Sequence, residues 1–121
     1  MFQIDRSSAI APYEQLRSQI VEAVSSGQLA VDTRLPTVRA LAAELGTAAG
    51  TIARAYRELE EAGVVVTRGR NGTFIAAHGD AAERAVQHAA AAYAEVVRSL
   101  HVSDDVAIEL VTRALHSSPT S

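Results

Sequence analysis

Residues 36–63 read PTVRALAAELGTAAGTIARAYRELEEAG, and this stretch decides the fold. Apolar side chains recur at helical spacing over residues 37–45, which predicts a short helix with Thr37 as its N-cap. Gly46 breaks the pattern, and the same spacing resumes over residues 49–62. Two short amphipathic helices joined by a tight glycine turn are typical of a helix-turn-helix.

The segments on either side of this pair complete a winged domain. Upstream, the apolar spacing predicts a helix over residues 12–26, preceded by an extended arm over residues 1–10. Downstream, β-branched and aromatic runs at residues 64–68 and 73–76 flank the turn GRNG at residues 69–72. This pattern indicates a β-hairpin. A hairpin directly after the two helices forms a wing. Its glycines lie between two strands and not at the start of a helix, so they do not form a phosphate-binding nucleotide loop.

Two further helices are predicted after the hairpin. Asp80, with Glu83 three residues later, resembles a capping box at the start of a long helix. Ser103 is placed to cap a last helix. The predicted fold class is therefore α+β and mainly α, with a winged helix-turn-helix DNA-binding domain at residues 1–77 and a short helical region at residues 78–121.

Both C-terminal helices carry a continuous apolar stripe, which two helices cannot bury by themselves. We expect the stripes to meet those of a second copy of the chain, so that the helical region forms a homodimer interface. The alternative is that the stripes pack back onto the first helix. The residues expected at the dimer interface are Val86, Tyr93, Val97, Leu100, Leu110 and Val111.

The composition narrows the possible classes of function. A chain of 121 residues is too short for a two-domain enzyme of the dinucleotide-binding or barrel type. The chain has no cysteine, which excludes disulfides and thiolate zinc sites. No apolar run is long enough to span a membrane and no leader opens the chain, so we expect a soluble, cytoplasmic protein. The net charge is −3, but six arginines and four acidic residues give residues 34–75 a charge of +2.

The residue patterns that carry catalysis or metal binding are not found in the sequence. The four histidines, at positions 78, 88, 101 and 116, do not have the spacing of metal ligands on one helix face, and we expect them to be solvated. No serine lies in a nucleophile-elbow motif, and no carboxylate pair lies among apolar residues. We therefore expect a protein that is not an enzyme and that needs no cofactor or metal.

Four blocks of sequence between residues 12 and 76 carry a family resemblance. PYEQLRSQIVEAVSSGQL, RLPTVRALAAELG, TIARAYRELEEAGVV and TRGRNGTFIA resemble, in this order, the N-terminal winged-helix domain of the GntR family of bacterial transcription regulators. TIARAYRELEEAG is similar to the YtrA subfamily, whose members have only a short two-helix C-terminal extension. The resemblance implies a dimeric DNA-binding regulator, usually a repressor, on an inverted-repeat operator in double-stranded DNA. It leaves open whether a small-molecule effector exists.

The sequence departs from the family pattern at two places. Ala48, Ala49 and Gly50 stand just before Thr51, where the family usually has polar side chains. In the wing, the first glycine, Gly69, has moved by one position. Because the small residues before Thr51 offer no side-chain hydrogen bonds, few side chains of the third helix are left to read DNA.

The third helix carries the candidate base-reading residues. On a helical wheel, Arg54 and Arg57 lie opposite the apolar face. A recognition helix reads bases with its N-terminal half, which assigns base contacts to Thr51 and Arg54. Arginine reads guanine through O6 and N7. Arg57 is expected either to reach a phosphate or to pair with Glu61 one turn later.

Further candidate contacts lie in the second helix and in the wing. The resemblance places Arg39 among the DNA-contacting arginines of the family. The alternative is a surface arginine that faces Glu44 or Asp32. We expect the wing to contact the DNA backbone or the minor groove. The wing residues expected at DNA are Arg68, Arg70 and Gly72.

We therefore expect a homodimeric transcription regulator that binds operator DNA. The alternative, from another class, is a helical module that contacts another protein or senses a small ligand without specific DNA readout. The two differ in one observation: a regulator binds its own promoter DNA and loses that affinity steeply at high salt.

Overall fold

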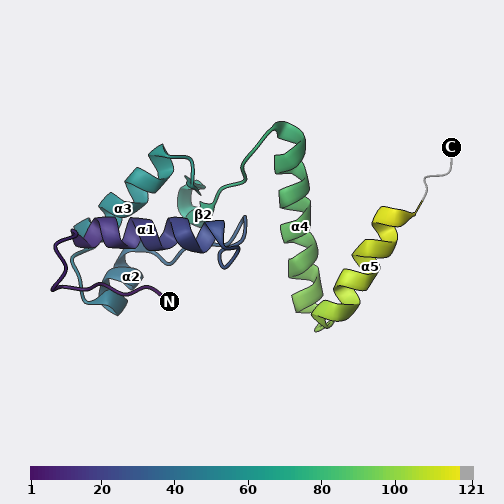
Figure 1. The fold of residues 1–121 in the computed structure, drawn as a ribbon, viewed down its shortest axis with the longest axis horizontal. Helices are drawn as coiled ribbons and strands as arrows, with labels where there is room; N and C mark the ends of the chain where they lie inside the picture. The colour runs from purple at the N-terminus through teal and green to yellow at the C-terminus, as the bar shows by residue number, and fades with distance from the viewer. Residues whose placement is uncertain (118–121) are drawn as a thin grey trace.

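The computed structural model describes residues 1–117 and confirms the predicted order of elements. Figure 1 shows α1 to α3 and the strands at one end of the molecule, with α4 and α5 standing apart from them. The fold is a winged helix-turn-helix followed by a helix pair. The elements are α1 (Pro12–Ser25), α2 (Val38–Leu45), α3 (Ala49–Glu61), β1 (Val65–Thr67), the 3-10 turn η1 (Gly69–Asn71), β2 (Thr73–Ile75), α4 (Ala81–Ser99) and α5 (Asp104–His116).

The three N-terminal helices enclose one hydrophobic core. Leu16 and Ile20 of α1, Leu41 of α2, and Ile52 and Leu59 of α3 are almost completely buried. Because these residues recur at helical spacing, one face of each helix points inward. Full burial of each such side chain contributes roughly 1.5–3 kcal/mol. The core thus holds α3 against α1 and α2 and leaves the opposite side of α3 exposed.

The turn between α2 and α3 has the local features that the sequence predicted. Oγ1 of Thr37 accepts a hydrogen bond from the backbone N–H of Ala40 at 3.1 Å and so caps α2. Gly46 ends α2 with a φ of 63°, a left-handed conformation that glycine adopts without strain. The Arg6 side chain donates to the carbonyls of Leu45 and Gly46, which ties the N-terminal arm to this turn.

The N-terminal arm packs along α1, as expected for an extended segment. Phe2 is buried in the core. The Gln19 side chain accepts from the N–H of Gln3 at 3.0 Å and donates to its carbonyl at 2.6 Å. The Gln15 side chain likewise accepts from the N–H of Asp5 at 2.8 Å and donates to the Asp5 carbonyl at 3.0 Å. Two glutamines one turn apart on α1 therefore hold the arm in a fixed register.

The wing is a small sheet with one more strand-like segment than predicted. β1 and β2 form the predicted antiparallel hairpin. Residues 33–35, in the connector between α1 and α2, pair with the other edge of β2: Leu35 N–H donates to Thr73 O at 2.8 Å, and Ile75 N–H donates to Thr33 O at 2.9 Å. The connector therefore braces the wing. The sequence does not predict this pairing, because a segment of three residues is too short to show an alternating pattern.

Both C-terminal helices begin at the predicted caps. At the start of α4, Glu83 N–H donates to Asp80 Oδ1 at 2.8 Å, and Asp80 N–H donates to Glu83 Oε1 at 3.4 Å, which completes the capping box. At the start of α5, Ser103 Oγ accepts from Val106 N–H at 3.3 Å. Over residues 1–117, no helix combines the length and the apolar composition needed to cross a bilayer.

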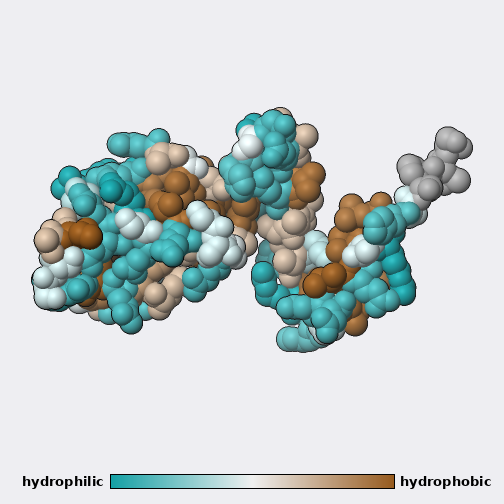
Figure 2. All heavy atoms as spheres, in the orientation of Figure 1, coloured by the Kyte–Doolittle hydropathy of each residue, from teal (hydrophilic) through white to brown (hydrophobic). Residues whose placement is uncertain are grey.

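The helices α4 and α5 form a V that is closed at the loop between them (Figure 1). Near the closed end, Val97 and Ala107 are buried, and the Tyr93 hydroxyl donates to the Ala107 carbonyl at 2.6 Å. Toward the open end the helices diverge, and Val86 and Leu115 are 68% and 78% exposed. Figure 2 shows hydrophobic surface on the flank of α5 that faces α4. The apolar stripes are thus paired at one end only.

The structure separates the residues expected at a dimer interface into two groups. Tyr93 and Val97 are already engaged between α4 and α5 of one chain, because both lie where the helices meet. Neither belongs to the core around α1, so packing of the stripes onto the first helix is not observed. The residues of the expected interface that remain exposed are Val86, Leu100, Leu110 and Val111.

Candidate nucleic-acid interface

The exposed side of α3 carries few polar groups near its start. Arg57 is exposed and Thr51 is half-buried in the first turn. The N-cap residue, Ala48, provides no side-chain hydrogen bond, as its side chain predicts. The helix end is therefore bordered by small residues, and Thr51 is the first side chain of α3 that could hydrogen-bond to a base.

Arg54 does not extend freely into solvent. Its guanidinium lies over the ring of Tyr13, 3.7 Å from the ring centroid, and its Nε lies 3.3 Å from Glu58 Oε2. The other carboxylate oxygen of Glu58 pairs with Arg17 of α1. Arg54 is outside the core, as the helical wheel predicted, with its side chain 54% exposed. The contact with α1 was not predicted, because the wheel describes one helix and not its neighbours.

Three of the arginines that were predicted to contact DNA are exposed and have no acidic partner within residues 1–117. These are Arg39 at the start of α2, Arg57 on α3 and Arg70 in η1. Neither the alternative pair of Arg57 with Glu61 nor that of Arg39 with Glu44 is formed in the described chain. All three guanidinium groups are thus available for phosphate, which arginine binds with a planar fork of donors.

In the wing, Arg68 is engaged within the protein. Its Nη2 lies 2.5 Å from Asp32 Oδ1, and its guanidinium lies 4.5 Å from the centroid of the Phe74 ring. Gly72 has a φ of 109°, and a Cβ at this position would lie 2.8 Å from Nε of Arg34. The positive φ favours glycine at this position, and any side chain there would also displace the Arg34 guanidinium.

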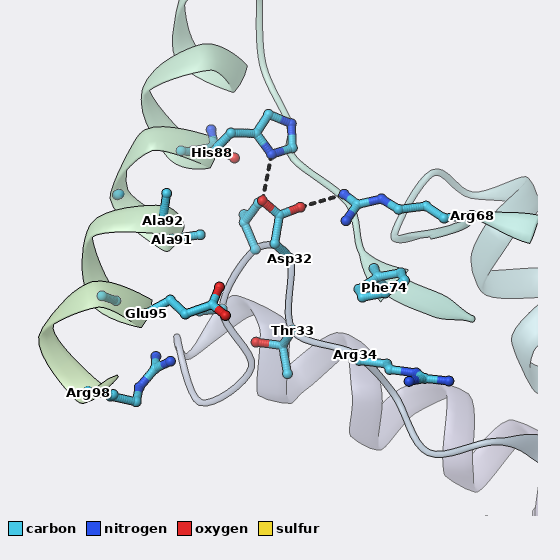
Figure 3. A pocket seen from close by; sticks show the side chains of 15 residues that line it. Asp32, Thr33, Arg34, Arg68, Phe74, His88, Ala91, Ala92, Glu95 and Arg98 are labelled. Atoms are coloured by element: carbon cyan, nitrogen blue, oxygen red, sulfur yellow. Dashed lines mark hydrogen bonds and ion pairs between the residues drawn. The ribbon is translucent and has the colours of Figure 1, made fainter. Parts of the chain in front are cut away.

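Asp32 joins the wing to α4. Its Oδ2 lies 2.7 Å from Nδ1 of His88, beside a groove of about 840 Å³ between residues 30–34 and α4 (Figure 3). Burial raises the pKa of the Asp32 carboxyl, but the hydrogen bonds with His88 and Arg68 outweigh this effect and hold the pKa below its usual value. His88 is exposed, as expected for a solvated histidine, but its ring also contacts Asp32, which the sequence did not predict.

A hydrogen bond from a buried tyrosine links α3 to the residue before the N-cap of α2. The Tyr56 hydroxyl donates to the carbonyl of Pro36, just before α2, at 2.8 Å. Burial raises the pKa of Tyr56 to about 12, because the phenolate would lose its hydration. Tyr56 is part of the core, as predicted, and its hydroxyl also links the recognition helix to the start of the preceding helix.

Two arginines near this surface were not predicted. Arg34 lies against the wing at Gly72, and Arg6 caps the turn after α2. Neither lies on a periodic helix face, so spacing alone could not identify them. Within residues 1–117, no three histidine, aspartate or glutamate side chains gather in a way that could hold a metal ion.

Comparisons with known proteins agree with this arrangement. The sequence profile described as "Bacterial regulatory proteins, gntR family" matches residues 12–75. The HTH-type transcriptional regulator Rv1152 of Mycobacterium tuberculosis is 49% identical over 100 residues, which cover 83% of this chain and 82% of the relative.

A solved structure extends the similarity from the winged unit to the helix pair. YtrA from Sulfolobus acidocaldarius, a GntR-family transcription factor, superposes with a TM-score of 0.59 at 25% identity, over 93% of this chain and 94% of that protein. The DNA-binding domain of AraR, in complex with operator ORE1, superposes with a TM-score of 0.53 at 27% identity, over 63% and 95%. The chain belongs to the GntR family and is a DNA-binding transcriptional regulator of the YtrA-like kind.

Proposed function

We propose that this regulator is a cytoplasmic repressor that binds an inverted-repeat operator as a homodimer. The observation that carries the proposal is the combination of an arginine-bearing recognition surface with a helix pair whose apolar sides have no partner in the described chain. Exposed apolar patches of this kind mark interaction surfaces. The large apolar side chains exposed on the helix pair are Val86, Val96, Leu100, Val106, Ile108, Leu110, Val111 and Leu115.

The proposed occupant of this apolar surface is a second copy of the chain. The V leaves one side of α4 and one side of α5 open, and both sides carry the same kind of residue, so a two-fold arrangement is self-complementary. The winged unit faces the opposite side of α4 through Asp32 and His88 and does not compete for this surface. We therefore propose residues 1–77 as the DNA-binding unit and residues 78–121 as the dimerisation region.

The proposed DNA surface divides into phosphate contacts and base contacts. Arg39, Arg57 and Arg70 are assigned to phosphate, because each is exposed without an acidic partner in the described chain. Thr51 and Arg54 are assigned to bases, because they lie in the N-terminal half of α3. The similarity to the operator-bound domain of AraR supports this orientation of the winged unit.

Arg54 and Arg68 reach DNA in this proposal by exchanging one partner for another. When Arg54 leaves Glu58, that carboxylate keeps Arg17. When Arg68 leaves Asp32, that carboxylate keeps His88. Neither exchange leaves a carboxylate without a hydrogen-bond partner, and exposed ion pairs contribute only about 0–1 kcal/mol, so DNA can compete for both arginines. Gly72 contributes by keeping the wing turn open.

The test of the proposed function compares variants on the protein's own promoter DNA. Arg54→Ala should keep the fold and the oligomeric state but lose about ten-fold or more in affinity, since a bidentate arginine–guanine pair is worth roughly 1–3 kcal/mol. On a library of single-base operator variants, the preference should relax at one base pair per half-site, in mirror-related positions. Equal weakening on every variant would make Arg54 a phosphate contact.

The matched control is Arg113→Ala. Arg113 lies on α5 and pairs with Glu109 there, far along the chain from the winged unit. Its removal should change neither the affinity nor the base preference. A wild-type protein that dimerises but binds all DNA sequences equally would instead support a helical interaction or sensing module without specific readout.

A second candidate role, ligand sensing, is favoured by the groove beside His88. Its volume of about 840 Å³ falls within the range of small-molecule sites. A ligand there would touch both the winged unit and α4, and so would couple DNA binding to the position of the helix pair. Measuring operator affinity with a panel of small carboxylates and phosphates tests the role, and an unchanged affinity across the panel would exclude these ligand classes.

A further inference from the structure

Arg34 is placed beside the wing by backbone hydrogen bonds rather than by its own side chain. Its neighbours Thr33 and Leu35 pair with β2 at 2.9 Å and 2.8 Å. The position of Arg34 relative to the wing is thus fixed by the same ladder that holds β2. A change of the Arg34 side chain leaves these backbone bonds intact.

The Arg34 side chain then follows the wing toward its turn. In Figure 3 its guanidinium points away from α4, although Arg34 also belongs to the lining of the groove beside His88. Its Nε, Nη2 and Cζ lie 2.8 Å, 3.3 Å and 3.4 Å from the point where a Cβ of Gly72 would be. The absence of a side chain at Gly72 therefore makes room for the guanidinium against the wing backbone.

The charge of Arg34 is not neutralised within the described residues. Arg34 is exposed and has no carboxylate within ion-pair distance in residues 1–117. Arg68, just after β1, pairs with Asp32 instead. The positive charges of the wing that have no acidic partner in this part of the chain are thus Arg34, which lies against Gly72, and Arg70, which lies within the turn that ends at Gly72.

We propose that Arg34 is a DNA-phosphate contact that acts with Arg70 as the charged pair of the wing. A guanidinium held at a fixed place presents several N–H donors, and a phosphate next to the wing accepts them without regard to base sequence. Gly72 positions Arg34 by leaving it this space. The inference rests on the proposed DNA binding by the winged unit and adds a residue outside the motif of the recognition helix.

The experiment measures DNA affinity against salt for the full chain and two variants. Arg34→Gln keeps most of the side-chain length without the charge, whereas Arg34→Lys keeps the charge without the fork. Arg34→Gln should lower affinity for operator and unrelated DNA by similar factors. It should also flatten the log–log salt slope by about 0.9 for each phosphate that the protein no longer neutralises, hence about twice this in a two-fold dimer. Arg34→Lys should retain the wild-type slope.

Three outcomes would overturn the assignment. An unchanged slope in Arg34→Gln would show that Arg34 touches no phosphate. Equal losses of slope in both variants would show that the shape of the wing, and not charge, matters. A loss confined to operator DNA would make Arg34 a base contact. A wild-type chain that binds no DNA would instead remove the proposed function itself, and Arg70→Ala, which should flatten the slope as Arg34→Gln does, provides the positive control.

Discussion

The winged unit and the helix pair both carry apolar stripes, but they bury them to very different degrees. In the winged unit, fourteen buried side chains between Phe2 and Ile75 form one cluster. In the described part of the helix pair, only Val97 and Ala107 are buried. The first region thus encloses a core of its own, whereas the second leaves most of its large apolar side chains exposed.

The two regions differ in burial because their helices have different numbers of packing neighbours. Each helix of the winged unit has neighbours on more than one side, and the sheet and the N-terminal arm close the remaining gaps. Two helices that cross near one end touch only over a short length, and a region this small cannot enclose a core. A similar hydrophobic pattern therefore has different consequences in the two regions.

The largest effect is expected where the helix pair lacks a partner. Leu110→Glu places a charge on the exposed apolar side of α5 and should convert the proposed dimer into monomers, because a charge in an apolar contact costs several kcal/mol unless it finds a partner. The winged unit should unfold at the same temperature as before. Sedimentation velocity over a range of concentrations measures the change.

Val97→Glu is the informative companion to this variant. Val97 is buried between α4 and α5 of one chain, so the charge should open the helix pair itself and reduce the helical circular dichroism. A fragment ending at Ala77 should be folded and monomeric. If that fragment remains a dimer, the interface lies in the winged unit and the contrast between the two regions does not hold.

The next effect contrasts a core residue with an exposed one. Ile52→Ala, at a fully buried position, should lower the free energy of unfolding by about 2–5 kcal/mol at every protein concentration. Leu115→Ala, at a position 78% exposed in one chain, should have an effect only at concentrations where the dimer forms. Chemical denaturation at several concentrations tests this, and a loss for Leu115→Ala in dilute solution would show that α5 is already packed in the monomer.

A smaller effect compares two tyrosines that make the same bond in the two regions. Tyr56 donates to Pro36 O at 2.8 Å, and Tyr93 donates to Ala107 O at 2.6 Å. Tyr56→Phe should cost about 1 kcal/mol, since the buried Tyr56 side chain loses its hydrogen bond to the Pro36 carbonyl. Tyr93→Phe should cost less, because Tyr93 is half-buried and water can replace it. Equal costs would show that the helix pair is as closed as the winged unit.

The raised pKa of Tyr56 predicts a fall in stability at alkaline pH. Tyr56 ionises near pH 10 in the unfolded chain but only at about 12 in the folded protein. The unfolded state therefore loses protons first, and the free energy of unfolding decreases as the pH rises between these values. Tyr56→Phe should remove this component. Denaturation curves of the two proteins at neutral and alkaline pH measure it, and parallel losses in both would assign the effect to other groups.

The smallest expected effect is on the link between the two regions. Asp32→Asn weakens the exposed pairs with Arg68 and His88, so global stability should change by less than about 1 kcal/mol. The angle between α4 and the winged unit should nevertheless vary more. Spin labels at Ser18 and Ala85 would report a broader distance distribution.

The control for this link is Glu109→Gln, which breaks an ion pair within α5 and should leave that distribution unchanged. An unchanged distribution in Asp32→Asn would mean that contacts other than Asp32 hold α4 in place. Either result shows how strongly the winged unit and the helix pair are joined.

The sequence by itself determined the elements, their order and their ends. Thr37, Gly46 and Asp80 were assigned as a cap, a stop and a capping box, and the structure confirms each one. These features depend on hydrogen bonds and spacing within four residues, so the chain near each position contains all the information needed. The winged fold follows because α2, α3 and the hairpin come directly after one another in the sequence.

Only the tertiary structure decided what each exposed side chain touches. Arg54 stacks on Tyr13, Arg68 pairs with Asp32, and the short segment 33–35 adds a strand to the wing. A long arginine side chain can reach several acceptors from one backbone position, and sequence spacing does not rank them. The choice among them depends on which distant elements the core packs side by side. For this reason the arginines without an acidic partner in residues 1–117, such as Arg34 and Arg70, could be distinguished from the engaged ones only in three dimensions.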